Sequence, residues 1–204
     1  MNILKHLPRR GMLAAALAGI LLSVFLVVLA ITKTSNHSGS SALALTPISV
    51  SKKISYGWPI RLTIPSIGVD ATIEGVGLTD GGELGVPIGP LNAGWYKAGP
   101  RPGELGNAVI DGHFGLWKDG TATVFNNILN LQKGDKLYVS DKNGKPIVFV
   151  VSGFGIYDPA QDSTSIFKAG DRKAHLNLIT CNGIWIPSQK TYSNRLIVFS
   201  DKQI

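Results

Sequence analysis

The stretch "DKLYVSDKNGKPIVFVVSGFGIYD", residues 135–158, contains two strand-like runs joined by a turn. Both runs are rich in β-branched and aromatic residues, which is typical of strands. Asn143-Gly144 stands between them, and this dipeptide favours the type I′ hairpin turn, in which both central residues take positive φ. The stretch therefore predicts an antiparallel hairpin of strands 135–140 and 146–156.

The chain from residue 58 onward repeats this pattern of short strand-like runs broken by Gly and Pro. The sequence has 24 glycines and 11 prolines, which is consistent with many turns. Several strands at this spacing predict a mainly β fold, a closed barrel of about eight strands with one or two short helices. The further runs are "PIRLTIPSIG" (59–68), "VDATIEGVG" (69–77), "NAVIDGH" (107–113), "AHLNLITC" (174–181) and "NRLIVFSD" (194–201).

Two segments of this domain lie between the predicted strands. In "TVFNNILNLQKG", residues 123–134, apolar residues recur at helix-like spacing and Gly134 provides a C-cap signal, so we expect one helix packed on the barrel. Those apolar residues are Val124, Phe125, Ile128, Leu129 and Leu131. The segment 158–173 has no strong period, and a loop of this length is usually functional or mobile.

The N-terminal region contains an apolar run long enough to cross a bilayer. Gly11 to Ile31 is 21 residues without a charge, and a helix of this length spans roughly 31 Å, the thickness of a hydrocarbon core. Most of the nearby basic residues precede the run, so the positive-inside rule predicts that residues 1–10 are cytoplasmic and that the chain after the run is extracytoplasmic. A cleaved signal peptide is the alternative, with "SALA" (41–44) as the cleavage site.

We therefore expect a single-pass protein of the cell membrane, held in the lipid by an uncleaved signal anchor at 11–31. Residues 32–57 are rich in Ser and Thr and show no sustained period, which predicts a flexible extracytoplasmic tether. Residues 58–204 then form the folded domain outside the cell.

The formal net charge of +7 does not indicate a nucleic-acid partner. Four of the basic residues flank the apolar run, and the remaining 16 basic and 13 acidic residues show no basic stripe with interleaved aromatic residues. The carboxylates are dispersed, so no calcium site is expected. We expect neither a metal ion nor another cofactor.

Cys181 is the only cysteine in the chain, so a catalytic thiol would need a histidine elsewhere to exchange protons with it. His6 and His37 precede the predicted domain. His175 opens the same predicted strand as Cys181, about 20 Å away along it, and is interpreted as a structural or surface residue. His113 ends the predicted strand 107–113, where a side chain reaches a cleft from a rigid support, and it is the better partner.

Two further charged residues are candidates for this site. Arg195 opens the last predicted strand, and a guanidinium is a permanent cation that can stabilise the negative charge formed on a carbonyl oxygen during acyl transfer. Taken alone, Arg195 would be interpreted as an exposed charge at a strand end. Asp111 lies two residues before His113 on the same predicted strand face, and it is a possible orienter of that histidine.

These residues stand in motifs that resemble the sortases, membrane-anchored cysteine transpeptidases of Gram-positive bacteria. The motifs are "LITC" with Cys181, "GH" with His113 and "NRLIVFSD" with Arg195. The segments "RLTIPSIGVDATIEGVG", "GWYKAGPRPGELGNAVIDGH" and "TVFNNILNLQKGDKLYV" are also similar to the family. The resemblance extends from about Pro59 to Asp201 and is greatest to the class D, E and F sortases.

The resemblance implies a reaction and a role for each residue. Cys181 would attack the Thr–Gly bond of an LPXTG-like C-terminal sorting signal and form a thioester acyl-enzyme. His113 would protonate the leaving amine and later accept a proton from the incoming amine, while Arg195 would hold the substrate and the oxyanion. The acceptor would be an amine of the cell wall, since the short tether makes pilin polymerisation a weaker prediction; simple hydrolysis stays open.

The resemblance also implies supporting residues. Thr180 matches the threonine that precedes the nucleophile in the family, and strand alternation turns its side chain to the face opposite Cys181. The segment 158–173 corresponds to one wall of the groove that binds the sorting signal. Ile166 and Phe167 would either contact the signal there or pack against the barrel.

Other interpretations of the single cysteine can be compared by motif order. An L,D-transpeptidase would need a His-Gly pair shortly before the cysteine and a Ser-x-Gly-Cys context, and a papain-like enzyme would place its cysteine before its histidine. The sequence has neither order. A membrane-tethered, non-catalytic β-barrel binding module, with Cys181 as a small buried residue, is the alternative from another class.

Overall fold

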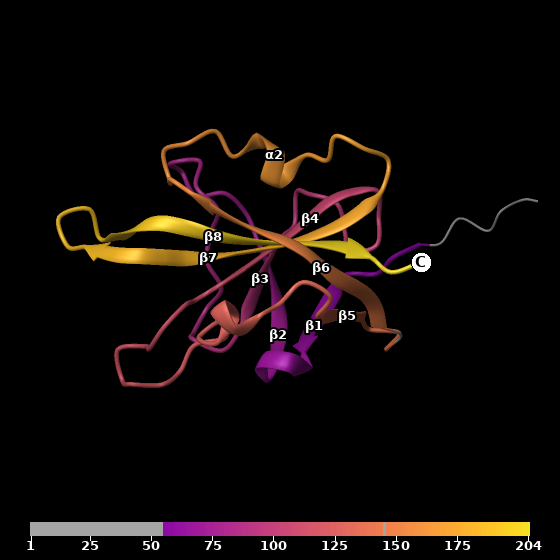
Figure 1. The fold of residues 1–204 in the computed structure, drawn as a ribbon, viewed down its shortest axis with the longest axis horizontal. Coiled ribbons are helices and arrows are strands. Elements are labelled where there is room, and N and C mark those ends of the chain that lie inside the picture. The colour runs from indigo at the N-terminus through magenta and orange to yellow at the C-terminus, as the bar shows by residue number, and fades with distance from the viewer. Residues whose placement is uncertain (1–54, 145) are drawn as a thin grey trace, which may run out of the picture. The chain divides into compact units, whose positions relative to one another are not determined.

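The computed structural model describes residues 55–144 and 146–204, which form a closed eight-stranded barrel (Figure 1). The order around the barrel is β1-β2-β3-β4-β7-β8-β6-β5, and β5 pairs with β1 to close it. The pairs β2–β3 and β4–β7 are parallel and the other pairs are antiparallel. The predicted mainly β barrel is confirmed. The strands are β1 (Pro59–Ile64), β2 (Val69–Val76), β3 (Ala93–Tyr96), β4 (Gly106–Gly112), β5 (Lys136–Asp141), β6 (Pro146–Tyr157), β7 (Ala174–Ile186) and β8 (Thr191–Lys202).

Short helical elements accompany the strands. They are the 3-10 helices η1 (Pro65–Ile67) and η2 (Ile128–Asn130) and the α-helix α2 (Thr164–Phe167). Within the described part of the chain, none of the helices has the length and apolar character needed to cross a bilayer. The predicted anchor at 11–31 lies outside the described residues, as do the predicted cytoplasmic end and most of the tether.

Apolar side chains on β4, β7 and β8 divide between two clusters because successive side chains of a strand point to opposite faces. Ile110, Leu178 and Val198 belong to the large cluster inside the barrel. Val109 and Ile197, one residue away, belong to a small cluster on the outer face. Figure 1 shows α2 beside these strands, and its residue Ile166 completes the outer cluster. The outer face of β4, β7 and β8 is therefore a second packed layer.

The hairpin between β5 and β6 forms as predicted, but its turn is of another type. Ser140 pairs with Pro146 and the strands are antiparallel. Gly144 has a φ of 77°, whereas Asn143 does not have positive φ, so the predicted type I′ turn is wrong. The Asp141 carboxylate accepts a hydrogen bond from the Asn143 N–H at 2.8 Å, and the Asp141 carbonyl accepts one from the Gly144 N–H at 2.9 Å. These bonds hold the chain in a turn that needs positive φ only at the glycine.

The predicted helix over residues 123–134 is wrong, because this segment forms turns and only the short 3-10 helix η2. The N–H groups of Val124 and Phe125 donate to the carbonyls of Pro90 and His113, at 2.8 and 3.0 Å, which ties the start of the segment to other loops. Its apolar side chains are nevertheless buried, except for that of Leu129. Their spacing reflected burial in the core rather than helical backbone.

The strands β7 and β8 are longer than the sequence predicted and form a hairpin that projects from the barrel at the left of Figure 1. Trp185 and Tyr192 face each other across it, with ring centroids 5.3 Å apart in an edge-to-face arrangement. At the base of this hairpin, Cys181 is paired with Arg195. The projecting hairpin therefore begins at the candidate site.

Candidate active site

The parallel pairing of β4 with β7 brings His113 beside Cys181. The last recorded pair of this ladder is Asp111 with Ile179. Two residues further in the same register, His113 follows the end of β4 and Cys181 lies in β7. Side chains two residues apart on a strand share a face, so Cys181 projects from the same outer face as Ile179, and His113 follows the end of the neighbouring strand β4.

Arg195 lies on the other side of Cys181, because these two residues are directly paired in the antiparallel ladder of β7 and β8. Its guanidinium donates hydrogen bonds to the carbonyls of Tyr192 and Asn194, at 3.2 and 3.1 Å, and to the Thr191 hydroxyl at 2.9 Å. These partners hold the cation at the base of the hairpin. The end of β4 and the paired strands β7 and β8 thus bring a histidine, a thiol and an arginine to one region of the barrel.

The protonation of the thiol depends on burial and on two opposite charges. Burial raises the pKa of the half-buried Cys181 above its ordinary value, since it removes the thiolate from water. The positive charge of Arg195 lowers this pKa and the carboxylate of Asp111 raises it. A resting thiol therefore needs a nearby cation, such as an imidazolium, to become nucleophilic.

The backbone and ring of His113 are held by residues that follow it in the chain. Its carbonyl accepts hydrogen bonds from the Phe125 N–H at 3.0 Å and the Thr123 hydroxyl at 2.9 Å. Its imidazole contacts the indole of Trp117, with ring centroids 4.9 Å apart and planes at 56°. At Gly112 a Cβ would come within 2.7 Å of Phe125, so this position has room only for glycine.

Thr123 and Trp117 were not identified from the sequence. The indole of Trp117 gave a weak signal, because it stands four residues after the candidate histidine in a turn rich in glycine. Thr123 gave none, because its hydroxyl acts through carbonyl groups of a loop whose course the sequence does not reveal.

A side-chain hydrogen bond of Thr180 joins β7, the strand of Cys181, to the end of β4, which His113 follows. Its hydroxyl donates a hydrogen bond of 2.6 Å to the carbonyl of Gly112, the residue before His113. The side chain is buried and lies on the face opposite Cys181, as strand alternation predicted. This contact joins the residue before Cys181 to the residue before His113.

Asp111 precedes His113 by two residues but is not bonded to it. Its carboxyl is buried, and the Oδ1 atom has no hydrogen-bond partner among the described residues. Burial raises the pKa of Asp111 to about 7, and the negative charge of Glu74 adds to the rise. The suggested role of Asp111 as an orienter of the histidine thus has no contact to support it.

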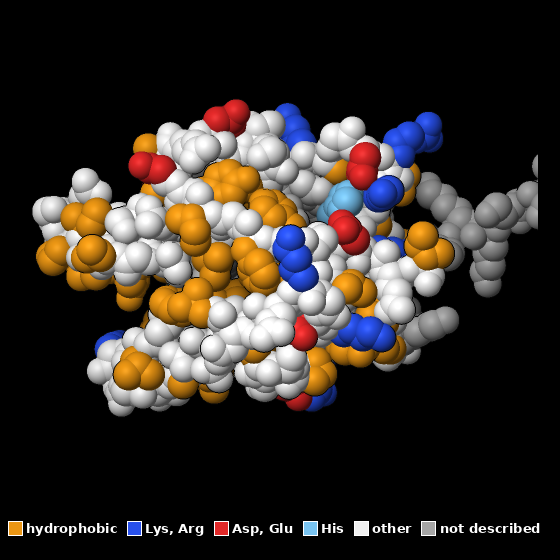
Figure 2. Space-filling view, viewed as in Figure 1, with side chains coloured by type: hydrophobic (Ala, Val, Ile, Leu, Met, Phe, Trp, Pro, Cys, Tyr) orange, Lys and Arg blue, Asp and Glu red, His pale blue; other side chains and the backbone are white. Residues whose placement is uncertain are grey.

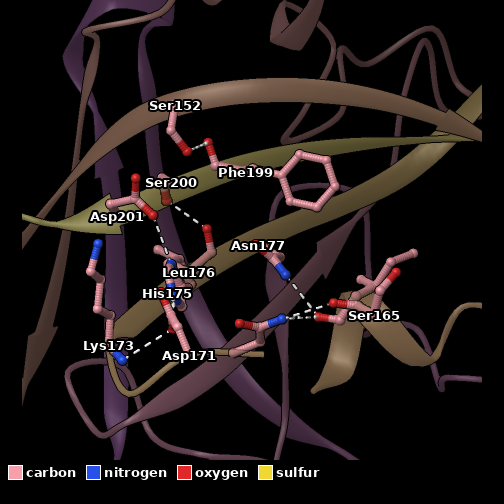
Figure 3. A network of polar contacts seen from close by, with 12 residues as sticks. Ser152, Ser165, Asp171, Lys173, His175, Leu176, Asn177, Phe199, Ser200 and Asp201 are labelled. Atoms are coloured by element: carbon pink, nitrogen blue, oxygen red, sulfur yellow. Dashed lines mark hydrogen bonds and ion pairs between the residues drawn. The ribbon is translucent and has the colours of Figure 1, made fainter. Parts of the chain in front are cut away.

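The segment 158–173 is held against the outer face by two buried amides (Figure 3). The Asn107 side chain donates to the carbonyls of Ser165 and Ile166, at 2.9 and 3.1 Å, and the Asn177 side chain donates to the Ile166 carbonyl at 2.7 Å. Ile166 is 3% exposed and packs in the outer cluster. Phe167 packs edge-to-face on Tyr96, with ring centroids 5.5 Å apart. Both residues contact the barrel.

His175 lies near the other end of β7 and binds two carboxylates (Figure 3). Its ring nitrogens lie 2.7 Å from Asp201 on β8 and 2.8 Å from Asp171 in the segment 158–173. Burial opposes the charged form of His175, but the hydrogen bonds to both carboxylates outweigh it and raise the pKa. A pocket of about 350 Å³ lies beside this histidine. His175 is thus a link between segments, six residues from Cys181.

The outer surface around these strands carries exposed apolar side chains. Figure 2 shows hydrophobic side chains gathered across the middle of this view and on the projecting hairpin at the left. Residues such as Ile156 on β6 and Ile184 and Trp185 on β7 contribute exposed apolar area. Within the described ranges, no group of three or more His, Cys, Asp and Glu residues could hold a metal ion.

Comparison with protein families gives a match that covers most of the chain. The family model described as "Sortase domain" matches residues 62–203. This range contains all of the residues assigned above to the candidate site. A comparison with curated proteins found no significant match.

Solved structures with the same fold are sortases. Sortase C-1 from Actinomyces oris is 29% identical, with a TM-score of 0.53 over 71% of this chain and 73% of that one. A Clostridium perfringens sortase D5 transpeptidase is 22% identical, with a TM-score of 0.53 over 72% and 79%. Sortase A from Corynebacterium diphtheriae, a lid mutant, is 22% identical, with a TM-score of 0.56 over 76% and 74%. The latter two similarities concern the fold alone.

Proposed function

This chain belongs to the sortase family of cysteine transpeptidases, and from that premise we propose that it cleaves an LPXTG-like C-terminal sorting signal and transfers the protein to an amine of the cell wall. The transfer passes through a thioester on Cys181. The observation that supports the proposal is the register of the barrel, in which Cys181 pairs with Arg195 and Ile179, two residues before the thiol, pairs with Asp111, two residues before His113.

In the first half of the proposed reaction, the Cys181 thiolate attacks the carbonyl carbon of the Thr–Gly bond. Negative charge develops on the carbonyl oxygen, and the guanidinium of Arg195 stabilises it. The carbon–nitrogen bond then breaks, His113 gives its proton to the leaving amine, and the acyl group stays on sulfur as a thioester. The rise in thiol pKa on burial makes the protonated imidazole important for keeping the thiolate.

In the second half, an amine replaces the thiol on the acyl group. The incoming amine loses a proton to His113 as its nitrogen attacks the thioester carbonyl, and Cys181 leaves as a thiolate. Arg195 again stabilises the oxyanion. Water in place of the amine gives hydrolysis, so the ratio of amide product to free acid separates a transpeptidase from a hydrolase of the same fold.

The place of action follows from the sequence prediction. The apolar run at 11–31 anchors the protein in the lipid with its N-terminus in the cytoplasm, and the tether 32–57 presents the barrel outside the cell. Sorting-signal proteins and cell-wall precursors would be the partners there. The features that support this location are the length of the run and the basic residues before it.

The test uses the full chain with a quenched LPXTG-type peptide, with and without a small peptide amine. Cys181→Ala and His113→Ala should each lose turnover by about 100-fold or more, because a missing nucleophile or proton donor costs at least this much. His37→Asn in the predicted tether is the matched control and should keep its rate. Equal, measurable turnover by Cys181→Ala and the parent would reject Cys181 as the nucleophile, whereas no turnover by the parent would reject the proposal and favour a non-catalytic binding module.

A further inference from the structure

Residues 113–123 form a loop that begins at the candidate acid, His113, and folds back on itself. Leu116 and Ala122 form an isolated antiparallel bridge across this loop. The Trp117 N–H donates a hydrogen bond of 2.7 Å to the carbonyl of Thr121 on the returning side. These contacts fix the backbone that carries the indole of Trp117.

The backbone of His113 is fixed at the base of the same loop. The Thr123 hydroxyl lies 2.9 and 2.8 Å from the carbonyl oxygens of His113 and Gly115, within hydrogen-bond distance of both. The side chain of Phe114, the next residue after the histidine, packs against the large core cluster. Because the main chain beside the imidazole is fixed, the orientation of the ring depends on rotation about its own side-chain bonds.

The indole of Trp117 is the group that can restrict this rotation. Among the described residues, the ring nitrogens of His113 have no hydrogen-bond partner, and the aromatic contact of the ring is with Trp117, at a centroid distance of 4.9 Å and an interplanar angle of 56°. A histidine side chain has about three favoured wells at χ1 and about two orientations at χ2. An indole packed against the imidazole occupies space that some of these rotamers need, so it reduces their number.

We propose that Trp117 is a positioning residue, whose indole holds the imidazole of His113 in the orientation that delivers a proton to the leaving amine. This inference rests on the proposed function, in which His113 is the general acid. Proton transfer requires hydrogen-bond geometry between the acid and the leaving nitrogen. A ring that samples several rotamers has this geometry for a smaller fraction of the time, and the step slows by that fraction.

The test compares two substrates that differ in their need for this proton. One is an LPXTG-type peptide with its Thr–Gly amide, and the other is the same peptide ended at the threonine as a phenyl ester. An amine leaves only after protonation, whereas a phenol, with a pKa of about 10, leaves as its anion. First-turnover release of each leaving group by the full chain gives the two acylation rates. Their amide-to-ester ratio cancels any effect on the thiolate, which attacks both substrates.

Loss of the indole should lower this amide-to-ester ratio. In Trp117→Ala, amide cleavage should slow by about three- to tenfold, the range expected for loss of one aromatic contact. Ester cleavage should change by less than about twofold, because its leaving group needs no acid. Trp117→Leu retains an apolar side chain without a ring and should also lower the ratio. Trp117→Phe restores an aromatic ring and should keep the ratio within about twofold of the parent.

Matched variants separate this effect from a general change of the protein. Leu116→Ala removes an exposed side chain of the same loop, and Trp58→Ala removes an exposed tryptophan that packs on Trp95. Both should leave the ratio unchanged. In the background of His113→Ala, adding Trp117→Ala should not lower the ratio further, because the indole acts through the imidazole.

Three results would overturn the inference. If Trp117→Ala slows both substrates by one factor, or slows neither, the indole does not act through the transferred proton. If it lowers the ratio further when His113 is already absent, it acts on another group. If Trp117→Phe lowers the ratio as far as Trp117→Ala, an aromatic contact is not what holds the imidazole.

The proposed function is tested separately by the parent and by His113→Ala. A parent that cleaves neither substrate, or an unchanged ratio in His113→Ala, rejects the proposed roles and this inference with them. A parent that cleaves the amide, with a ratio that falls in His113→Ala but not in Trp117→Ala, rejects only this inference.

Discussion

At the scale of single residues, the thiol of Cys181 lies between charges of opposite sign. Arg195, paired with it across β7 and β8, favours the thiolate, and Asp111 on β4 disfavours it. Burial works in the same direction as Asp111 and raises the pKa of the thiol. The reactivity of the cysteine therefore depends on groups that the fold places beside it.

Replacing Arg195 by Gln should raise the pKa of Cys181 further and slow its alkylation. The rate of iodoacetamide addition at a fixed pH near 7 reports the thiolate fraction, because the thiolate is the nucleophile. We expect a fall of several-fold in Arg195→Gln. The exposed Arg61, bound to Asp70, provides the matched control Arg61→Gln, which should alkylate at the parent rate. Equal rates for both variants would show that Arg195 does not act on the thiol.

Replacing Asp111 by Asn should change how stability depends on pH. The pKa of Asp111 rises from 3.8 to about 7 on folding because of burial, so the folded protein binds more protons than the unfolded chain between these values. Ionisation then destabilises the fold progressively as the pH rises from about 4 to about 7.

Asp111→Asn lacks this cost, so its stability relative to the parent should increase over the same range, by up to about 4 kcal/mol. Denaturant unfolding at several pH values between about 4 and 8 measures the difference. A difference that is constant with pH would contradict the raised pKa.

The candidate residues could be selected from the sequence, but their surroundings could not. A lone cysteine at the end of a strand-like run, and a histidine at the end of another, were visible as patterns. The contacts of Thr123 and Trp117 with His113 join residues through a turn whose course depends on tertiary structure. Strand alternation placed Asp111 on the correct face without revealing that its Oδ1 lacks a partner.

At the scale of elements, the segment 158–173 is joined to the barrel at two places. Asn107 and Asn177 bind the carbonyls around α2. His175 binds Asp171 of the segment and Asp201 of β8. The segment that the resemblance assigns to the groove wall is therefore ordered by polar contacts from β4, β7 and β8.

The bonds of His175 should make this element sensitive to pH. Its pKa is raised above 6.5 in the folded protein by hydrogen bonds to Asp171 and Asp201, against the effect of burial. The stability from the charged histidine is thus fully present below about pH 6.5 and is lost as the pH rises through the folded pKa.

The variant His175→Asn should lack this dependence. We expect the parent Tm to fall relative to that of the variant as the pH rises above about 6.5. Thermal unfolding in matched buffers measures both proteins, and His37→Asn serves as the control for loss of a histidine. Parallel Tm curves for the parent and His175→Asn would contradict the role of this link.

The local pattern of residue types along the sequence predicted the strands better than it predicted the turns and helices. The strand-like sequence of β5 and β6 predicted the antiparallel hairpin correctly. Burial of one face of each strand does not depend on the type of turn that joins them. The Asp141 carboxylate selected another turn by bonding to the Asn143 N–H. In residues 123–134, the apolar residues at helix-like spacing are buried in the core, but the backbone forms turns. The N–H groups at the start of this segment donate hydrogen bonds to loops outside it and not to a helix.

At the scale of the whole molecule, composition and strand pattern predicted a barrel, but they could not predict its strand order. The site exists because β4 lies parallel to β7, and Thr180 bonds to a carbonyl 68 residues away in the chain. Such a distant pairing has no local signal. The sequence therefore predicted the residues of the candidate site without predicting the pairing that brings their strands together.

The predicted membrane anchor at 11–31 leads to a prediction about the cellular fraction in which the whole protein is found. Deletion of residues 1–31 should move the protein from the membrane fraction to the soluble fraction of the cell, because the apolar run is the part long enough to span a bilayer. Fractionation of the full chain and the deleted chain measures this. Recovery of the full chain in the soluble fraction would contradict the anchor and favour a cleaved signal peptide.

The central claim is that Cys181 forms a thioester with the sorting signal. Intact-mass measurement of the full chain, mixed with an LPXTG-type peptide and quenched in acid, tests it most directly. We predict that the protein gains the mass of the peptide up to its threonine, that the adduct maps to Cys181, and that the C-terminal fragment is released in equal amount. Release of the fragment without an adduct on Cys181, or with an adduct on another residue, would contradict the account.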